Sequence, residues 1–159
     1  MQYSGTFSPG AVADRPDLTA GDPIAEAREM LRKAARLPFA ASHPLAWSSK
    51  FAQLVSGARG AVWQHITKAA RPDSAIARIE REEPRLHPAI ERQREEHADL
   101  ARQVDDLYSE VSVAGEVDIW RMIELGERAI LLEMALARHQ NRLLQMMYES
   151  THVDIGGEA

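Results

Sequence analysis

The sequence predicts an all-α protein arranged as an up-down-up-down four-helix bundle. In four long segments the apolar residues recur at steps of three and four, which is the spacing of one face of an α-helix. No segment alternates apolar and polar residues as a half-buried strand would, and no internal repeat is present. The connections between the segments are short, and short connections favour antiparallel neighbouring helices.

The beginning of the chain differs from the rest. Residues 1–21 show little periodicity and are rich in Ser, Gly, Pro, Thr and Asp, so we expect a disordered arm there. Asp22 followed by Pro23 is typical of an N-cap with proline at the first helical position. This pair predicts a helix over 22–37, which ends before Pro38 because proline cannot continue a helix.

The second predicted helix covers residues 45–70. Gly57 and Gly60 either weaken it locally or allow a neighbouring helix to approach closely. A turn at 72–74 precedes a short helical piece at 73–83. The seam of the second helix, meaning the face expected to be buried, consists of Phe51, Val55, Ala58, Val62 and His65.

Two longer helices complete the expected bundle, one over 86–112 and one over 117–151, separated by the loop VAGEVD. The tail that begins at Asp154 is expected to fold back near the end of the last helix, with its Gly-Gly pair supplying the turn. The helical bundle as a whole is therefore predicted over residues 22–159.

The bulk composition excludes several classes of function. The chain has 159 residues and a net charge of −5, so we expect one domain without the basic face of a nucleic-acid-binding protein. Lys and Arg are interleaved with Glu, which argues against binding to an anionic membrane surface. The absence of cysteine excludes disulfides, thiolate metal ligands and cysteine nucleophiles. Neither a membrane span nor a signal peptide is evident, so we expect a cytoplasmic protein.

Three of the predicted helices carry a histidine on an otherwise apolar seam. His139 occupies a position in the last helix where its register calls for another leucine, and His65 and His97 do the same in the second and third helices. At 1.5 Å per residue, His97 and His139 lie roughly 16 Å from the same end of an antiparallel bundle, and His65 lies about 8 Å from it. We expect the three imidazoles to point inward near one level and to be neutral, contacting each other, a carbonyl or a water.

The residues around these histidines do not complete a two-metal site. The positions four residues after His65, His97 and His139 hold Ala69, Ala101 and Leu143. The nearest carboxylates on these helices are Glu96, which is adjacent to a histidine and so turned about 100° away from it, and Glu133, which lies on a flank of the last helix. Three histidines and a water would be enough for zinc.

Most of the chain resembles a known family. The segments EPRLHPAIERQREEHADL and RHQNRLLQMMYESTHVDIGGE, preceded by His65 near the end of a helix, resemble the hemerythrin-like family, also called HHE cation-binding domains. The similarity is closest to a bacterial branch that ends in an RHxxR, YE and VDIGGE pattern, and it covers about residues 45–158. That pattern here consists of Arg138, His139, Arg142, Tyr148, Glu149, Val153, Asp154, Ile155, Gly156, Gly157 and Glu158.

The resemblance implies a four-helix bundle and, in the metal-bearing members, a non-haem di-iron centre for oxygen or redox chemistry. Carrying the ligands over leaves only His65, His97 and His139. The family's first-helix histidine has no counterpart within 22–37, and its two HxxxE patterns become His65…Ala69 and His139…Leu143. Two divalent ions need bridging carboxylates, so the resemblance implies a degenerate di-iron site with vestigial ligands.

We therefore expect a non-enzymatic hemerythrin-like binding or regulatory domain without a cofactor, whose partner is a protein rather than a nucleic acid or a membrane. The alternative is a mononuclear metal-binding protein that holds one iron or zinc ion on the three histidines and acts in oxygen, redox or metal sensing. An enzyme ranks third, because the sequence contains no acid/base pair or activated nucleophile.

The tryptophans, and two polar residues in the last helix, give two further expectations. Trp47, Trp63 and Trp120 are expected to pack at the helix interfaces with the indole N–H at the rim. Glu127 and Asn141 interrupt a second apolar stripe on the last helix. They mark either polar core positions or a face turned toward a partner.

Overall fold

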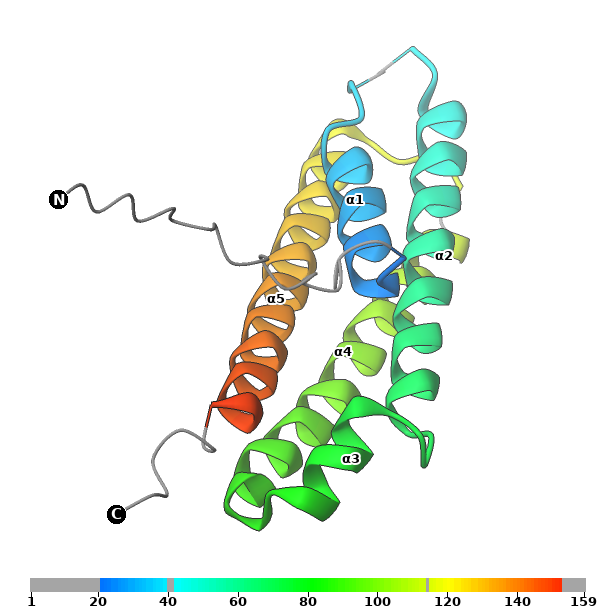
Figure 1. The fold of residues 1–159 in the computed structure, drawn as a ribbon. Helices are drawn as coiled ribbons and strands as arrows, with labels where there is room; N and C mark the ends of the chain where they lie inside the picture. The colour runs from blue at the N-terminus through cyan, green and yellow to red at the C-terminus, as the bar shows by residue number, and fades with distance from the viewer. Residues whose placement is uncertain (1–20, 40–41, 114, 153–159) are drawn as a thin grey trace, which may run out of the picture.

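The computed structural model describes residues 21–39, 42–113 and 115–152, and all regular structure within these ranges is helical (Figure 1). No strand occurs there, so the prediction of an all-α protein is confirmed. The elements are α1 (Pro23–Ala35), α2 (Pro44–Ala69), α3 (Ala75–Glu82), the 3₁₀ turn η1 (Pro84–Leu86), α4 (His87–Val113) and α5 (Ile119–Thr151).

The predicted helix boundaries agree with these elements to within two residues. The disordered arm predicted over 1–21 lies outside the described residues except for Gly21, and so does the fold-back predicted from Asp154. Among the described residues, no helix has both the length and the apolar character needed to cross a membrane.

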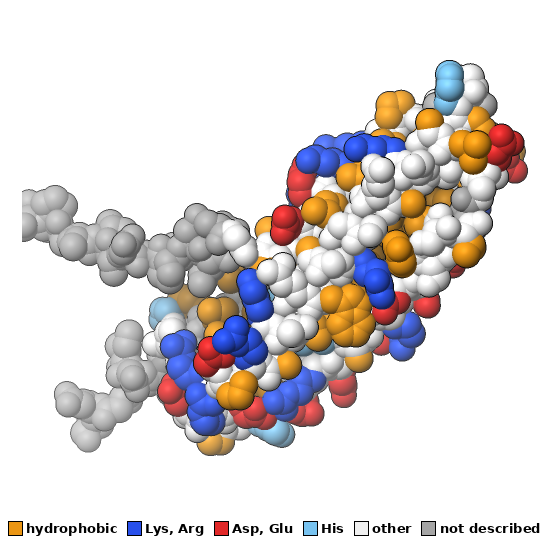
Figure 2. Space-filling view, turned by 90° about the vertical axis from the view of Figure 1, so that its right-hand side faces the viewer, with side chains coloured by type: hydrophobic (Ala, Val, Ile, Leu, Met, Phe, Trp, Pro, Cys, Tyr) orange, Lys and Arg blue, Asp and Glu red, His pale blue; other side chains and the backbone are white. Residues whose placement is uncertain are grey.

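The four longer helices lie side by side, with α1 and α4 running in one direction and α2 and α5 in the other (Figure 1). Both α1 and α4 pack against α2 and against α5. The short helix α3 lies at the end where α2 stops and α4 begins, and it has few contacts with the other helices. On the face shown in Figure 2, side chains of both charges are interspersed, as the mixed order of Lys, Arg and Glu in the sequence predicts.

Three helices begin at a side chain that accepts a backbone N–H. Asp22 Oδ1 accepts from the Ile24 N–H at 3.0 Å, Ser74 Oγ from the Ala77 N–H at 3.1 Å, and Asp118 Oδ1 from the Arg121 N–H at 2.8 Å. Such caps satisfy N–H groups that have no partner inside the helix. They explain why α1, α3 and α5 begin where they do.

One of the two glycines of α2 serves close helix packing. A Cβ at Gly57 would lie 2.5 Å from Sδ of Met30 on α1, whereas a Cβ at Gly60 would meet nothing within 4 Å. The expectation of a close approach is therefore confirmed at Gly57 and wrong at Gly60.

The buried apolar side chains form two clusters. The larger cluster joins α1 and α2 to the C-terminal half of α4 and the N-terminal half of α5, and Val62, Leu100 and Leu136 are among its members. The smaller one gathers around α3 and η1, at the other end of α4 and α5, and it consists of Ile76, Ile79, Leu86, Ile90 and Met146. The three seam histidines lie between the two clusters along α2, α4 and α5.

The second apolar stripe of α5 is not part of the core. Trp120 is 76% exposed, Met134 is 46% exposed, and both Glu127 and Asn141 are exposed. The packing expected of the tryptophans is therefore right for Trp47, although its indole N–H is buried rather than at the rim, and wrong for Trp120. The reason is that α5 packs against α1, α4 and α3 through one face only. Trp63 is 41% exposed and donates its indole N–H to Asp105 Oδ1 at 3.1 Å.

Candidate metal centre

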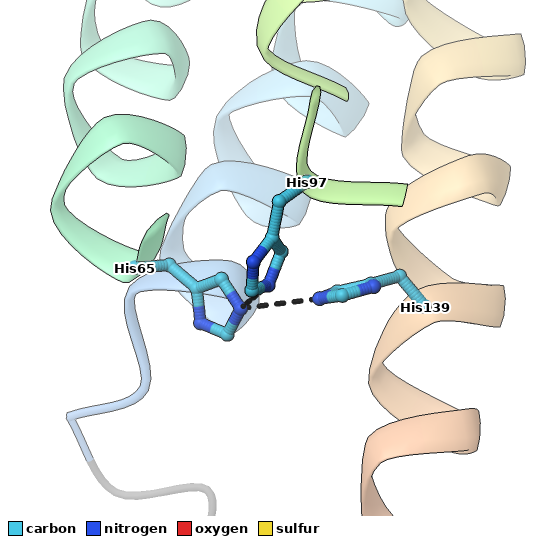
Figure 3. A group of neighbouring side chains, drawn as sticks. All are labelled: His65, His97 and His139. Atoms are coloured by element: carbon cyan, nitrogen blue, oxygen red, sulfur yellow. Dashed lines mark hydrogen bonds between the residues drawn. The ribbon is translucent and has the colours of Figure 1, made fainter. Parts of the chain in front are cut away.

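Three helices bring the predicted histidines to one place. His65 comes from the end of α2, His97 from the middle of α4 and His139 from α5, and Figure 3 shows the three rings pointing toward one another. The exposed fractions are 8% for His65, 8% for His97 and 1% for His139. All three imidazoles are therefore withdrawn from bulk water, as their seam positions predict.

The convergence involves the same ring atom of each residue. His65 Nε2 lies 3.1 Å from His97 Nε2 and 3.1 Å from His139 Nε2. The three residues offer ligand atoms that all lie within 4.8 Å of one another. Three nitrogens bound tetrahedrally to one zinc ion are about 3.3 Å apart, given Zn–N bonds of about 2.0–2.1 Å. The two distances from His65 Nε2 are close to that value.

Hydrogen bonds between the rings do not account for this arrangement. His139 Nδ1 lies 2.9 Å from Glu96 Oε2, and a carboxylate can only accept, so the ring proton is assigned to Nδ1 and the Nε2 lone pair faces the cluster. His65 Nε2 then has to carry a proton and donate it to His139, and a protonated Nε2 has no lone pair with which to accept from His97. One N–H cannot make two linear hydrogen bonds. A cation that receives a lone pair from each ring would satisfy all three nitrogens.

Burial keeps these rings in the neutral form that binds metal. Desolvation, together with the neighbouring His139, lowers the pKa of His65 to about 4. Desolvation, together with both other histidines, lowers the pKa of His97 to about 3. Desolvation also lowers the pKa of His139, although the hydrogen bond to Glu96 opposes that shift. At neutral pH the cluster therefore presents lone pairs rather than positive charges.

Sequence reasoning named Glu96 as one of the nearest carboxylates but missed its contact with His139. It is turned away from His97 on its own helix, as expected, but its carboxylate reaches across to His139 on α5. Its other oxygen accepts from Arg142 Nη1. A carboxylate on the distal nitrogen orients a ligand histidine and increases its basicity. The available signal was the position of Glu96 and Arg142 beside two histidines on neighbouring helices.

The other carboxylate considered from the sequence does not serve the cluster. Glu133 Oε1 accepts from Arg28 Nε and from Arg32 Nη2, both at 2.9 Å, and so ties α5 to α1. Ala69 and Leu143 stand where a carboxylate one turn from His65 and His139 would reach the site. The donor set therefore fits one metal ion and does not fit two.

A buried amide one turn from His97 is consistent with a polar guest. Gln93 is 2% exposed, and its Oε1 is buried without a hydrogen-bond partner among the described residues. A buried acceptor without a partner costs roughly 1–3 kcal/mol, so such atoms usually contact a water or an ion. Gln93 follows the same seam of α4 as His97 and can hold water beside the cluster.

A second group with ligand-like spacing lies on the surface. Glu80, His87 and Glu91 offer atoms within 4.8 Å of one another. Arg94 already donates to both carboxylates, so this is an ion-pair cluster. His43 and His152 are exposed and distant in sequence from the cluster.

No family model matches the chain, and neither the curated proteins nor the solved structures contain a significant match to it.

Proposed function

We propose that this protein is a hemerythrin-like, up-down-up-down four-helix bundle that binds a single divalent transition-metal ion, iron or zinc, through His65, His97 and His139. The observation that carries the proposal is that the Nε2 atoms of the three histidines meet, while hydrogen bonds between the rings cannot account for both contacts of His65. Imidazole nitrogens bind both zinc and iron, so the donor set allows either ion.

The absence of bridging carboxylates argues for one ion rather than a di-iron pair. Three neutral histidines bring no negative charge, and the carboxylate of Glu96 acts through His139. A metal held by three protein ligands keeps a position open for water or a small ligand. This arrangement supports a sensing or binding role in oxygen, redox or metal responses. Among the described residues, no side chain is placed as a proton donor or nucleophile at the cluster, so we propose no enzymatic activity.

A second candidate function is a metal-free binding or regulatory module, in which the histidines are remnants of a lost site. Besides Ala69 and Leu143, the observation that favours it is the exposed apolar face of α5, defined by Trp120, Ile130, Leu131 and Met134. Exposed apolar side chains along one helix suit a protein partner.

Metal analysis of protein purified without a histidine tag separates the two candidates. We expect about one iron or zinc ion per chain, and loss of that ion in His97→Ala. His87→Ala is the matched control, since His87 is an exposed histidine on the same helix, and it should retain the metal. Cobalt substitution should give the intense visible absorption of a four-coordinate site. Two irons per chain would contradict the mononuclear proposal, and no uptake of zinc, iron or cobalt would favour the metal-free module.

A further inference from the structure

A cavity of about 360 Å³ opens beside the histidine cluster. It lies between the start of α1, the end of α2, the start of α3 and the C-terminal part of α5, and His65 forms part of its lining. Its volume is within the range of small-molecule pockets, which begins at about 300 Å³. The apolar part of its lining consists of Ala69, Ala75, Ile76, Leu143, Leu144 and Met147.

The cavity occupies the space that carboxylates would fill in a two-metal site. Ala69 and Leu143, which stand one turn after His65 and His139, both line it. On this side of the cluster, where a two-metal site would have carboxylates, the protein has apolar side chains and a cavity. A guest would replace water on these side chains, which is favourable by about 25 cal/mol per Å² of apolar surface.

One charged side chain at the cavity, Lys68, suits an anionic group on that guest. Helices α1 and α3 both begin at its lining, and helix N-termini carry partial positive charge. Asp22 brings one negative charge to the same lining, which offsets the helix N-termini, and its two oxygens accept from the Ile24 N–H and from Gln140 Nε2. Lys68 lines the cavity and forms no ion pair with the described residues. Lys68 is the cation left to meet an anion.

We propose that this cavity binds a small organic carboxylate, with its hydrocarbon part against Ile76, Leu143 and Met147 and its carboxylate between Lys68 and His65. Only one part of this inference rests on the proposed function, namely that the carboxylate takes the open position of a metal ion at the cluster. The apolar contacts and the Lys68 contact need no metal.

A second cavity on the opposite side of α3 provides the control. Its volume is about 530 Å³ and it is lined in part by His97, Ala98 and Arg94. Its arginines already have partners, since Arg94 pairs with Glu80 and Arg71 with Asp73. It offers no free cation to an anion.

The test is calorimetric titration with hexanoate and with hexanol, in metal-free and in zinc-loaded protein. We expect saturable hexanoate binding in both forms, tighter with zinc, and weaker binding of hexanol. Lys68→Gln should weaken hexanoate binding about two- to fivefold, since an exposed ion pair is worth up to about 1 kcal/mol. Ala75→Leu, which fills the cavity, should weaken it at least about tenfold. Ala98→Leu, the same change in the second cavity, should leave it unchanged.

Several outcomes would overturn the inference. They are the absence of saturable hexanoate binding in both forms, equal affinity for hexanol and hexanoate, and equal losses in Ala75→Leu and Ala98→Leu. If Ala75→Leu does not fold, Leu144→Phe fills the same cavity from α5. Failure of the proposed function is distinguishable, because protein that takes up no metal can still bind hexanoate. Conversely, protein that binds zinc but not hexanoate refutes only the cavity ligand.

Discussion

Replacing Glu96 by Gln tests whether the carboxylate behind His139 serves metal binding. The change keeps the size of the side chain and an oxygen that can accept from His139 Nδ1, now at 2.9 Å, but it removes the negative charge. Removing such a partner typically lowers metal affinity by about 10- to 100-fold, equivalent to about 1.4–2.7 kcal/mol. Arg142 also loses its ion pair with Glu96. Its side chain is half exposed, so this loss should cost little.

The assay is a zinc titration in competition with a chromophoric chelator at pH 7. Glu95→Gln is the matched control, because Glu95 is an exposed neighbour on the same helix and its replacement removes the same charge from the protein. We expect Glu95→Gln to keep wild-type affinity. Unchanged affinity in Glu96→Gln, or equal losses in the two variants, would refute the reasoning that a charged acceptor on Nδ1 supports the site.

Three further changes have defined outcomes. His139→Leu should alter the unfolding free energy of metal-free protein by less than about 1 kcal/mol, since Glu96 keeps Arg142 as a partner. The same change should abolish the rise in melting temperature that zinc gives. A large loss of unfolding free energy in the metal-free variant would contradict this. Metal-free protein should lose stability as the pH falls below 6.5, because the unfolded chain protonates there while folded His65 and His97 stay neutral down to about 4 and about 3. The slope should approach about 3 kcal/mol per pH unit for two rings in urea unfolding, and a flat profile would exclude neutral buried rings. Trp47→Phe should change the unfolding free energy by less than about 1 kcal/mol, because removing the buried, unpartnered indole N–H offsets the lost contacts. Phe51→Ala, which leaves a cavity in the core, should cost about 3–5 kcal/mol in the same measurement.

The helices were predictable because their signals are local. Periodicity, prolines and caps such as Asp22 and Ser74 act within a few residues, and the observed boundaries follow them. The inward seam of α5 was predictable for the same reason. Its outer stripe was not, because Trp120 and Met134 have helical spacing too, and burial depends on how many helices surround α5.

The histidine cluster was predictable in membership but not in detail. Counting residues placed His65 nearer the end of the bundle than His97 and His139, yet the three Nε2 atoms meet. The difference arises because α2 ends soon after His65, while α3 and the start of α4 continue beyond it. The role of Glu96 depends on the rotation of α4 relative to α5, which no spacing within one helix encodes.

The polar layer formed by the histidines also bears on how cooperatively the protein unfolds. It separates the larger apolar cluster from the smaller one around Ile76 and Ile90. Apolar contacts that would couple the two ends are interrupted at this level, and α3 has few contacts of its own. Without metal, the end containing α3 can open at a lower free energy than the rest of the molecule, as a separate cooperative unit. A metal ion that bridges α2, α4 and α5 would join the two units into one transition.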